Sequence, residues 1–242
     1  FVQAFIVFAK LSSGDRTVGS YYDRGDLWRM TKRIVLPWCV LSVVFAALGF
    51  RYEHTTEWVW NLGAFGPGSY YLALYLISYF ALPLLWLGLR RCGAWALVVG
   101  CVGAVAAEVL FPTLLSSVRV PALVYRCTPV RYLGVFALAF AAVTSWSRLE
   151  RRRERAAVFA LMAVSLALAV VGSIWPSCRL PAPEDYGWWI CHLPYYVFPC
   201  GLSLMVLYAF RKRPLPRAVS LLGRSTWYVF LAQMLFYACL AK

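Results

Sequence analysis

The chain has 242 residues, of which 62% are hydrophobic and 14% are charged, and its formal net charge is +14. An ordinary soluble domain is about 45–50% apolar and about 25% charged, so this chain has too few polar side chains to cover a water-exposed surface. The composition excludes a soluble enzyme, a disordered chain and a small disulfide-stabilised protein. It predicts an all-α, polytopic membrane protein, because helices satisfy their own backbone groups in lipid.

Apolar segments recur along the whole chain. A bilayer core about 30 Å thick requires about 20 helical residues. A partial span is predicted at residues 1–9. Full spans are predicted at residues 34–50, 69–89, 93–112, 132–146, 156–175, 195–210 and 226–241. We therefore expect one transmembrane helix bundle over residues 1–242, with about seven full spans and one partial span.

The basic residues are distributed unevenly between alternate loops. Loops 10–33, 90–92, 147–155 and 211–225 contain 18 Lys and Arg residues, whereas loops 51–68, 113–131 and 176–194 contain 5. The positive-inside rule places the first set in the cytoplasm. The rule also accounts for the high net charge, so we expect the lipid bilayer as a partner and no nucleic acid. The arginines of loop 147–155 are interpreted as topology anchors, with lipid headgroup contact as the alternative.

Three polar residues near or within the spans are candidates for a polar cavity. Glu108 is the acidic residue predicted within a span, towards its outer end, and Arg131 begins the next span at the same level. They could line a cavity that receives a substrate, or they could form a structural ion pair between two helices. Gln233, in the middle of the last span, could hydrogen-bond across helices or contact a substrate.

The cysteines and histidines do not suggest a metal site. The eight cysteines form no Cys-x-x-Cys pair, and His54 and His192 have no other ligands at metal-binding spacing. Cys127, Cys178 and Cys191 fall in loops assigned to the outside, where a disulfide is permitted. At most one pair can form among these three, and the sequence does not choose it.

The cytoplasmic stretch YYDRGDLWRMTKR, at residues 21–33, is basic and aromatic, and it leads directly into a predicted span. It is typical of an amphipathic segment at the membrane surface. Arg29, Lys32 and Arg33 lie within about one helical turn, so they can occupy neighbouring positions of one helix face.

Four stretches, in this order and spacing, resemble the membrane acyltransferase 3 family of multi-pass O-acyltransferases. They are WRMTKRIVLP at 28–37, GPGSYYLALYLISYFALPLL at 66–85, RYL at 131–133 and LGRSTWYVFLAQMLFY at 222–237. Together they extend over nearly the whole chain. The resemblance implies a protein of the bacterial plasma membrane that transfers an acyl group, most simply acetyl, from cytoplasmic acyl-CoA to a hydroxyl of a carbohydrate or envelope glycan. Acyl-CoA is then a co-substrate, and no bound cofactor is expected.

The resemblance also implies roles for individual residues. Arg29, Lys32 and Arg33 match the family's basic motif at a helix start and are candidates for binding the CoA phosphates; topology anchoring is the alternative. Members of the family carry a catalytic histidine in their first helix, and no histidine of this chain has a comparable place. Phe1 lies within an apolar stretch, so we expect the chain to begin inside a helix and the catalytic residue to lie upstream. The 242-residue chain alone is then expected to be inactive.

Two other functions remain open at this stage. A transporter or flippase of a lipid-linked saccharide would place ionisable groups near the bilayer midplane, in helices related by inverted repeats. Glu108 and Arg131 instead lie towards one side, and the two halves of the sequence are not visibly related. A membrane scaffold without catalysis is the third possibility.

Overall fold

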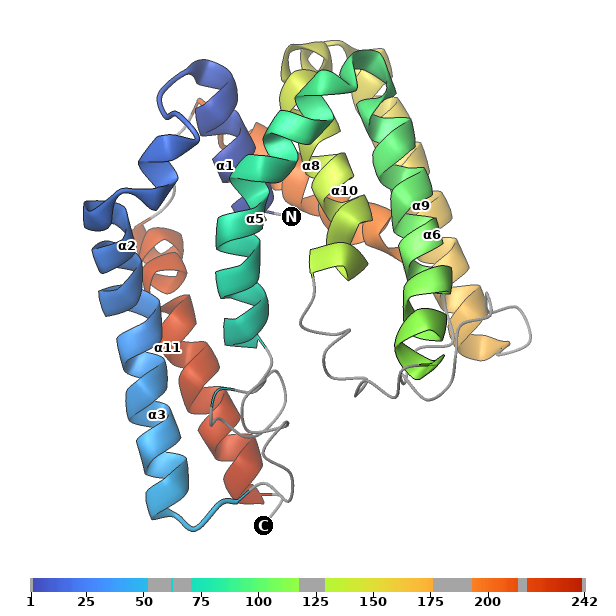
Figure 1. The fold of residues 1–242 in the computed structure, drawn as a ribbon. Coiled ribbons are helices and arrows are strands. Elements are labelled where there is room, and N and C mark those ends of the chain that lie inside the picture. Colours follow the sequence, from blue (N-terminus) through green and yellow to red (C-terminus); the bar gives the residue numbers. More distant parts are fainter. Residues whose placement is uncertain are drawn as a thin grey trace. The chain divides into compact units, whose positions relative to one another are not determined.

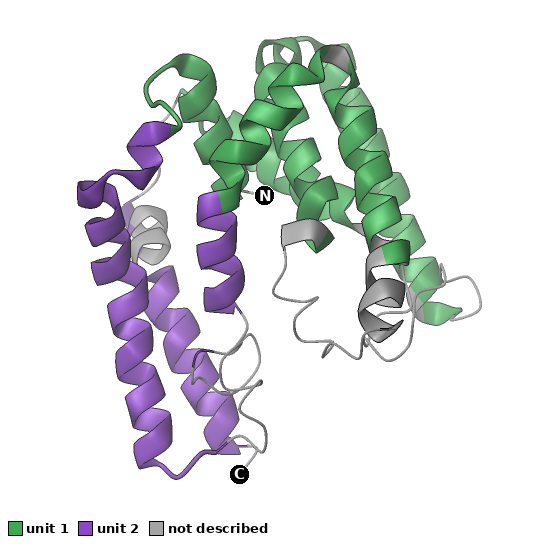
Figure 2. Ribbon diagram, in the orientation of Figure 1, with its two compact units in different colours: residues 1–18, 81–213 green, residues 19–80, 214–242 purple. Residues whose placement is uncertain are grey.

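The computed structural model describes residues 2–51, 62, 71–117, 129–175, 193–212 and 217–240. All regular secondary structure in this part of the chain is helical. The helices form two compact units (Figures 1 and 2). Unit 1 contains residues 1–18 and 81–213, and unit 2 contains residues 19–80 and 214–242. Helix α5 (Tyr71–Arg91) begins in unit 2 and ends in unit 1.

Every predicted apolar segment contains a helix. Unit 1 comprises α1 (Val2–Ser13), the end of α5, α6 (Ala96–Ser117), α8 (Leu133–Thr144), α9 (Arg152–Ile174) and α10 (Leu193–Ala209), with short 3-10 turns η3 (Gly93–Trp95), η4 (Pro129–Tyr132) and η5 (Trp146–Glu150). Unit 2 comprises η1 (Gly19–Tyr22), α2 (Arg24–Met30), the π-helical turn η2 (Thr31–Val35), α3 (Leu36–Ala47), the start of α5, and α11 (Arg217–Leu240).

Three helices in the described part of the chain are both long and apolar enough to cross a membrane. They are Arg24–Ala47, Tyr71–Arg91 and Arg152–Gly172. A helix of 21 residues, such as α5, is about 32 Å long, which matches the hydrocarbon core. The shorter apolar helices do not meet this criterion over their described residues, so the prediction of about seven full spans is not confirmed.

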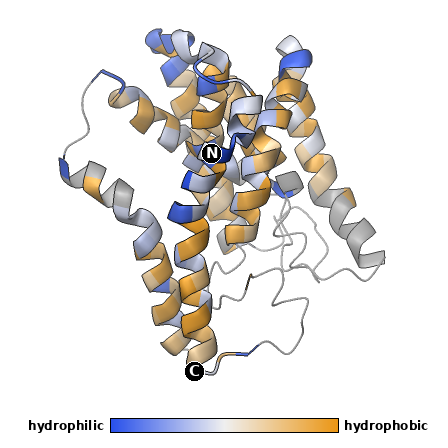
Figure 3. Ribbon diagram, turned by 60° about the vertical axis from the view of Figure 1, so that its left-hand side comes forward, coloured by the Kyte–Doolittle hydropathy of each residue, from blue (hydrophilic) through white to orange (hydrophobic). Residues whose placement is uncertain are grey.

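These three candidate spans are apolar on almost all sides. Figure 3 shows hydrophobic residues along most of their length. Large apolar side chains point outward from them, for example Val43, which is 68% exposed, and Val164, which is 58% exposed. A protein in water would bury such continuous apolar faces, whereas lipid covers them without cost.

The core of unit 1 depends on aromatic rings and on small residues. Phe8, Trp86 and Phe140 form a triangle between α1, α5 and α8, with ring centroids 5.1–6.2 Å apart. Helices α6 and α8 approach closely at Gly100, where an added Cβ would lie 2.3 Å from the Cβ of Ala137. A glycine is therefore required at this contact.

The core of unit 2 joins α3, the start of α5 and α11. Its buried residues are Trp38, Leu41, Phe45, Leu72, Leu231, Met234 and Ala238. The indole of Trp38 donates a hydrogen bond to the carbonyl of Leu62 at 3.1 Å and stacks on Trp227 at a centroid distance of 5.9 Å. These contacts hold the helix that carries the basic segment against α11.

Candidate functional site

The basic segment at residues 21–33 folds as a helix that begins at Arg24. Asp23 is its N-cap: the residue is extended, with φ −64° and ψ 141°, and its carboxylate accepts a hydrogen bond from the amide of Gly25 at 3.0 Å. Asp26 adds a second negative charge in the first turn. Both carboxylates favour the positive end of the helix dipole, so the sequence itself determines where this helix begins.

A π-helical turn connects this helix to α3, the apolar part of the candidate span. The amide of Leu36 bonds the carbonyl of Thr31, five residues back. Pro37 follows in the first turn of α3, and in a regular α-helix its ring would clash with the carbonyl of Arg33. The wider turn relieves this clash. The expected amphipathic segment is thus helical and continuous with the next span, as residues Arg24–Ala47.

The basic side chains occupy neighbouring positions on this stretch of helix. Residues four apart are neighbours on a helix surface. Lys32 places its Nζ 4.9 Å from the ring centroid of Trp28, four residues earlier. By the same spacing Arg33 lies above Arg29, and both are exposed. The three predicted donor-binding residues are therefore brought together on one short stretch of helix.

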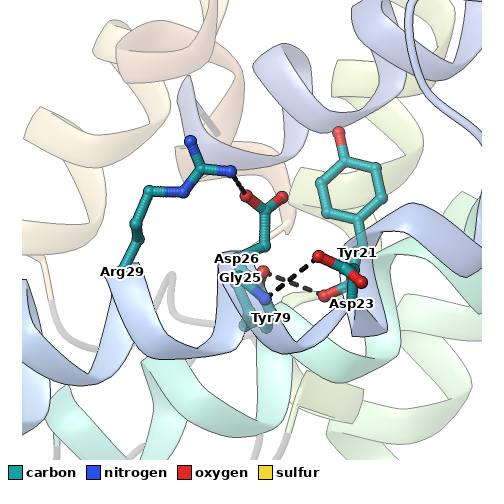
Figure 4. A network of polar contacts seen from close by, with 6 residues as sticks. All are labelled: Tyr21, Asp23, Gly25, Asp26, Arg29 and Tyr79. Carbon is teal, nitrogen blue, oxygen red and sulfur yellow. Dashed lines mark hydrogen bonds and ion pairs between the residues drawn. The ribbon is translucent and has the colours of Figure 1, made fainter.

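Arg29 has a local partner that the sequence analysis did not consider. Its guanidinium forms an ion pair with the carboxylate of Asp26, three residues earlier (Figure 4). The Arg29 side chain is 67% exposed, whereas that of Asp26 is 11% exposed. A pair three residues apart on a helix, with its arginine exposed to solvent, contributes little stability, about 0.2–0.5 kcal/mol. An anion that offers more acceptors can therefore share or replace Asp26.

The start of the basic helix is tied to α5 by two tyrosines. Tyr79 donates from its hydroxyl to the carbonyl of Tyr21 at 3.0 Å, as Figure 4 shows, and Tyr22 donates to the carbonyl of Phe80 at 2.8 Å. Burial raises the pKa of the Tyr22 hydroxyl above its ordinary value, which keeps it a donor. The basic helix is therefore positioned by packing within unit 2.

An open hollow of about 570 Å³ lies against the basic helix, lined by Arg24, Gly25, Leu27, Trp28 and Thr31. Except for Gly25, these residues follow the spacing of one helix face. The hollow combines an exposed aromatic ring with a cation, which suits a phosphorylated or otherwise anionic ligand.

The candidates for the polar cavity have different environments. Arg131 lies in η4 of unit 1 and is 1% exposed; its guanidinium lies 5.4 Å from the ring centroid of Tyr132, which stacks on Tyr196. Helix α6, which carries Glu108, packs against η4. The structure describes the backbone of Glu108 but not its side chain. Their pairing stays a prediction. Gln233 lies on α11 of unit 2, where its side chain is exposed.

No protein-family model, curated protein or solved structure matches the chain. The assignment of a function therefore depends on the residues of this chain. Within the described ranges, no group of three His, Cys, Asp or Glu residues could hold a metal ion. His54, His192, Cys127, Cys178 and Cys191 lie outside those ranges, so the disulfide question stays open.

A cluster at the basic end of unit 1 was not predicted from the sequence. Arg155 of α9 and Arg211, just after α10, both lie over the ring of Tyr208, at 5.7 and 3.6 Å from its centroid. Trp146 packs edge-on against the same ring at 5.9 Å. The signal was present in the sequence, since Tyr208 precedes the arginines of loop 211–225 by three residues.

Proposed function

We propose that this protein is a multi-pass membrane O-acyltransferase of the bacterial inner membrane. It would transfer an acyl group, most simply acetyl, from cytoplasmic acyl-CoA to a hydroxyl of a carbohydrate or envelope glycan. One observation carries the proposal: a helix long and apolar enough to span a membrane begins with a turn that carries three exposed cations, Arg29, Lys32 and Arg33. The resemblance to the acyltransferase 3 family adds the reaction class.

We also propose the full topology of seven spans and one partial span. Its support is that a helix occupies every predicted segment, and that α6 and α11 have 22 and 24 residues. The contacts of Arg155 and Arg211 with Tyr208 add a second argument, because they bring two of the four basic loops to one end of unit 1. In Figure 1 the α5–α6 and α8–α9 turns also lie at one end of this unit. Such an arrangement is expected if the basic loops are cytoplasmic.

In the proposed reaction the acceptor hydroxyl oxygen attacks the carbonyl carbon of the thioester, a general base takes the hydroxyl proton, and the bond from carbon to sulfur breaks. The CoA thiolate leaves and recovers a proton. Arg29, Lys32 and Arg33 would hold the CoA phosphates by charge-assisted hydrogen bonds and so orient the thioester. Ion pairing with Asp26 fixes the position of the Arg29 guanidinium before the donor arrives.

For the acceptor we propose the polar region around Arg131 and Glu108. A buried cation beside stacked tyrosine rings supports this choice, since aromatic faces and charged donors are suited to sugar rings and hydroxyls. Gln233 is kept as a separate acceptor-side candidate in unit 2.

Donor binding can be tested with the purified 242-residue chain in detergent, by calorimetric titration with CoA at low ionic strength. The double variant Arg29→Gln/Arg33→Gln is expected to weaken binding by about thirtyfold or more, because each of the two lost charge-assisted contacts contributes about 1 kcal/mol or more. The matched control is Arg152→Gln/Arg153→Gln, which removes two exposed arginines from unit 1. Equal loss in both variants would indicate nonspecific attraction by the net charge and would contradict the assignment.

Acyl transfer itself should be measured with the gene product in its native membranes, supplied with radiolabelled acetyl-CoA. The expected product is a glycan fraction that carries label and releases it as acetate in mild alkali. A transporter predicts movement of a lipid-linked saccharide without labelling, and a scaffold predicts neither activity. Either result would reject the enzyme proposal.

A further inference from the structure

A cavity of about 200 Å³ lies inside unit 1, between α8, η5, α9 and α10. Ten of its thirteen lining residues are apolar or glycine, and the others are Ser145, Arg148 and Glu154. Ser145 and Arg148 belong to the turn between α8 and α9, and Glu154 lies in the first turn of α9. The cavity thus has an apolar body and a charged end.

Small residues create this space. Ala141, Ala142 and Gly201 lie on its wall, and none of them projects a long side chain. Gly201 cannot be replaced without movement, because an added Cβ would lie 2.5 Å from Cγ of Met162. The cavity is half open, and its apolar walls lack van der Waals partners wherever it is unfilled. It therefore favours an apolar occupant.

The two ends of the cavity indicate the chemical nature of that occupant. Arg148 and Glu154 lie in a stretch that contains five arginines and two glutamates, from residue 147 to residue 155. Leu161, on the opposite side, lines the cavity and is 59% exposed on the apolar surface of α9. An anionic group is favoured at the first end, and hydrocarbon is favoured at the second.

We propose that this cavity binds one aliphatic chain of an anionic amphiphile, with the head group at the Arg148 end. Its size sets the length of the enclosed chain. A dry cavity of about 150 Å³ accepts benzene, which has six carbons, so 200 Å³ accommodates about eight carbons. The chain could belong to a fatty acyl group from the aqueous phase or to an anionic membrane lipid, since the chemistry is the same. The proposal does not depend on the O-acyltransferase function.

The test uses the 242-residue chain in phosphatidylcholine nanodiscs and octanoic acid that carries a photoreactive diazirine near its end. After irradiation, mass spectrometry should find adducts concentrated on cavity residues such as Cys200 and Leu204. Val158→Phe places a ring in the cavity and should lower the adduct yield by about tenfold, a loss of about 1.4 kcal/mol of binding. The control Val164→Phe makes the same change on the same helix at a site that is 58% exposed. It should leave the yield unchanged.

Two competition experiments identify the source of the aliphatic chain. Competition by phosphatidylglycerol in the nanodisc assigns the site to a membrane lipid, and competition by added octanoyl-CoA assigns it to a soluble acyl group. Adducts spread evenly over all helices would overturn the proposal, and so would equal yields from Val158→Phe and wild type. If Val158→Phe fails to fold, Ala141→Leu fills the same space from α8 and is judged by the same criteria.

Discussion

The hydroxyl of Tyr22 donates to the main-chain carbonyl of Phe80 at 2.8 Å, and the rings of the two residues stack with an interplanar angle of 4°. Phe80 precedes Pro83, which has no amide hydrogen and distorts the hydrogen bonding of the preceding helical turn. Tyr22 therefore satisfies a carbonyl next to the weakened turn of α5. This pairing is not evident from the sequence, because Tyr22 and Phe80 are 58 residues apart.

Tyr22→Phe keeps the stacked ring and removes the hydrogen bond. We expect the free energy of unfolding to fall by about 1 kcal/mol, measured by thermal unfolding in detergent. Tyr228→Phe is the control, because that ring is 57% exposed on α11 and the same atom is removed. Equal effects of the two substitutions would show that the bond to Phe80 adds nothing.

The same hydroxyl of Tyr22 should make the free energy of unfolding depend on pH in the alkaline range. Its pKa is raised in the folded protein above the ordinary 10.0, so the folded state favours the protonated form. The stabilisation is complete below pH 10.0 and is lost as pH rises through the folded-state pKa. The difference in melting temperature between wild type and Tyr22→Phe should therefore shrink above that pH. A constant difference would contradict the assignment.

Asp23 is expected to determine where the basic helix begins. Asp23→Ala removes the acceptor for the amide of Gly25 and should lower stability by about 1 kcal/mol. Because the cationic turn follows this cap, the same variant should also weaken CoA binding under the proposed function. Asp23→Asn keeps a capping oxygen and should retain most of the stability. If Asn behaves like Ala, the cap geometry is not what stabilises the helix.

Gly100 and Gly103 provide a matched pair on α6. Gly100→Ala would place a Cβ 2.3 Å from the Cβ of Ala137. That atom is attached directly to the backbone of α8, so it cannot move aside as the end of a long side chain could. We expect a loss of about 1–3 kcal/mol from overpacking. Gly103 has nothing within 4 Å of an added Cβ, so Gly103→Ala should be neutral or slightly stabilising. Unfolding in denaturant, followed by circular dichroism, separates the two outcomes.

The helices could be predicted from sequence because hydropathy alone decides where backbone must be helical in lipid. Their ends were less accurate where a helix continues beyond the apolar run. The last span was predicted at residues 226–241, and the helix that contains it, α11, already begins at Arg217, because Arg217 and Arg224 are good helix formers. In the same way, the helix that contains the span predicted at 34–50 already begins at Arg24.

The candidate site was predicted less completely. The placement of Arg29, Lys32 and Arg33 on one helical stretch follows from their spacing, and Asp26 could have been recognised as a partner of Arg29 three residues away. The π turn depends on relief of a steric clash at Pro37, and the contacts of Tyr208 depend on how three elements pack. Hydropathy and periodicity contain neither kind of information.

The sidedness of the loops is the prediction on which most of the proposed function depends. Single cysteines at Glu150, Lys212 and Asp185 should be introduced into a variant without the native cysteines and tested with a membrane-impermeant thiol reagent in intact cells. Glu150 and Lys212 are exposed and flank Arg155 and Arg211, which meet on Tyr208 at one end of unit 1. Both should therefore react only after the membrane is opened.

Asp185 lies outside the described residues, in a loop that the charge distribution assigns to the outside. It should react in intact cells, because a loop with a single arginine is not retained in the cytoplasm by its charge. Reaction of Glu150→Cys and Asp185→Cys from the same face would require an even number of crossings between them. The acyl-CoA side would then be misassigned, and the basic helix at Arg29 would lose its access to a cytoplasmic donor.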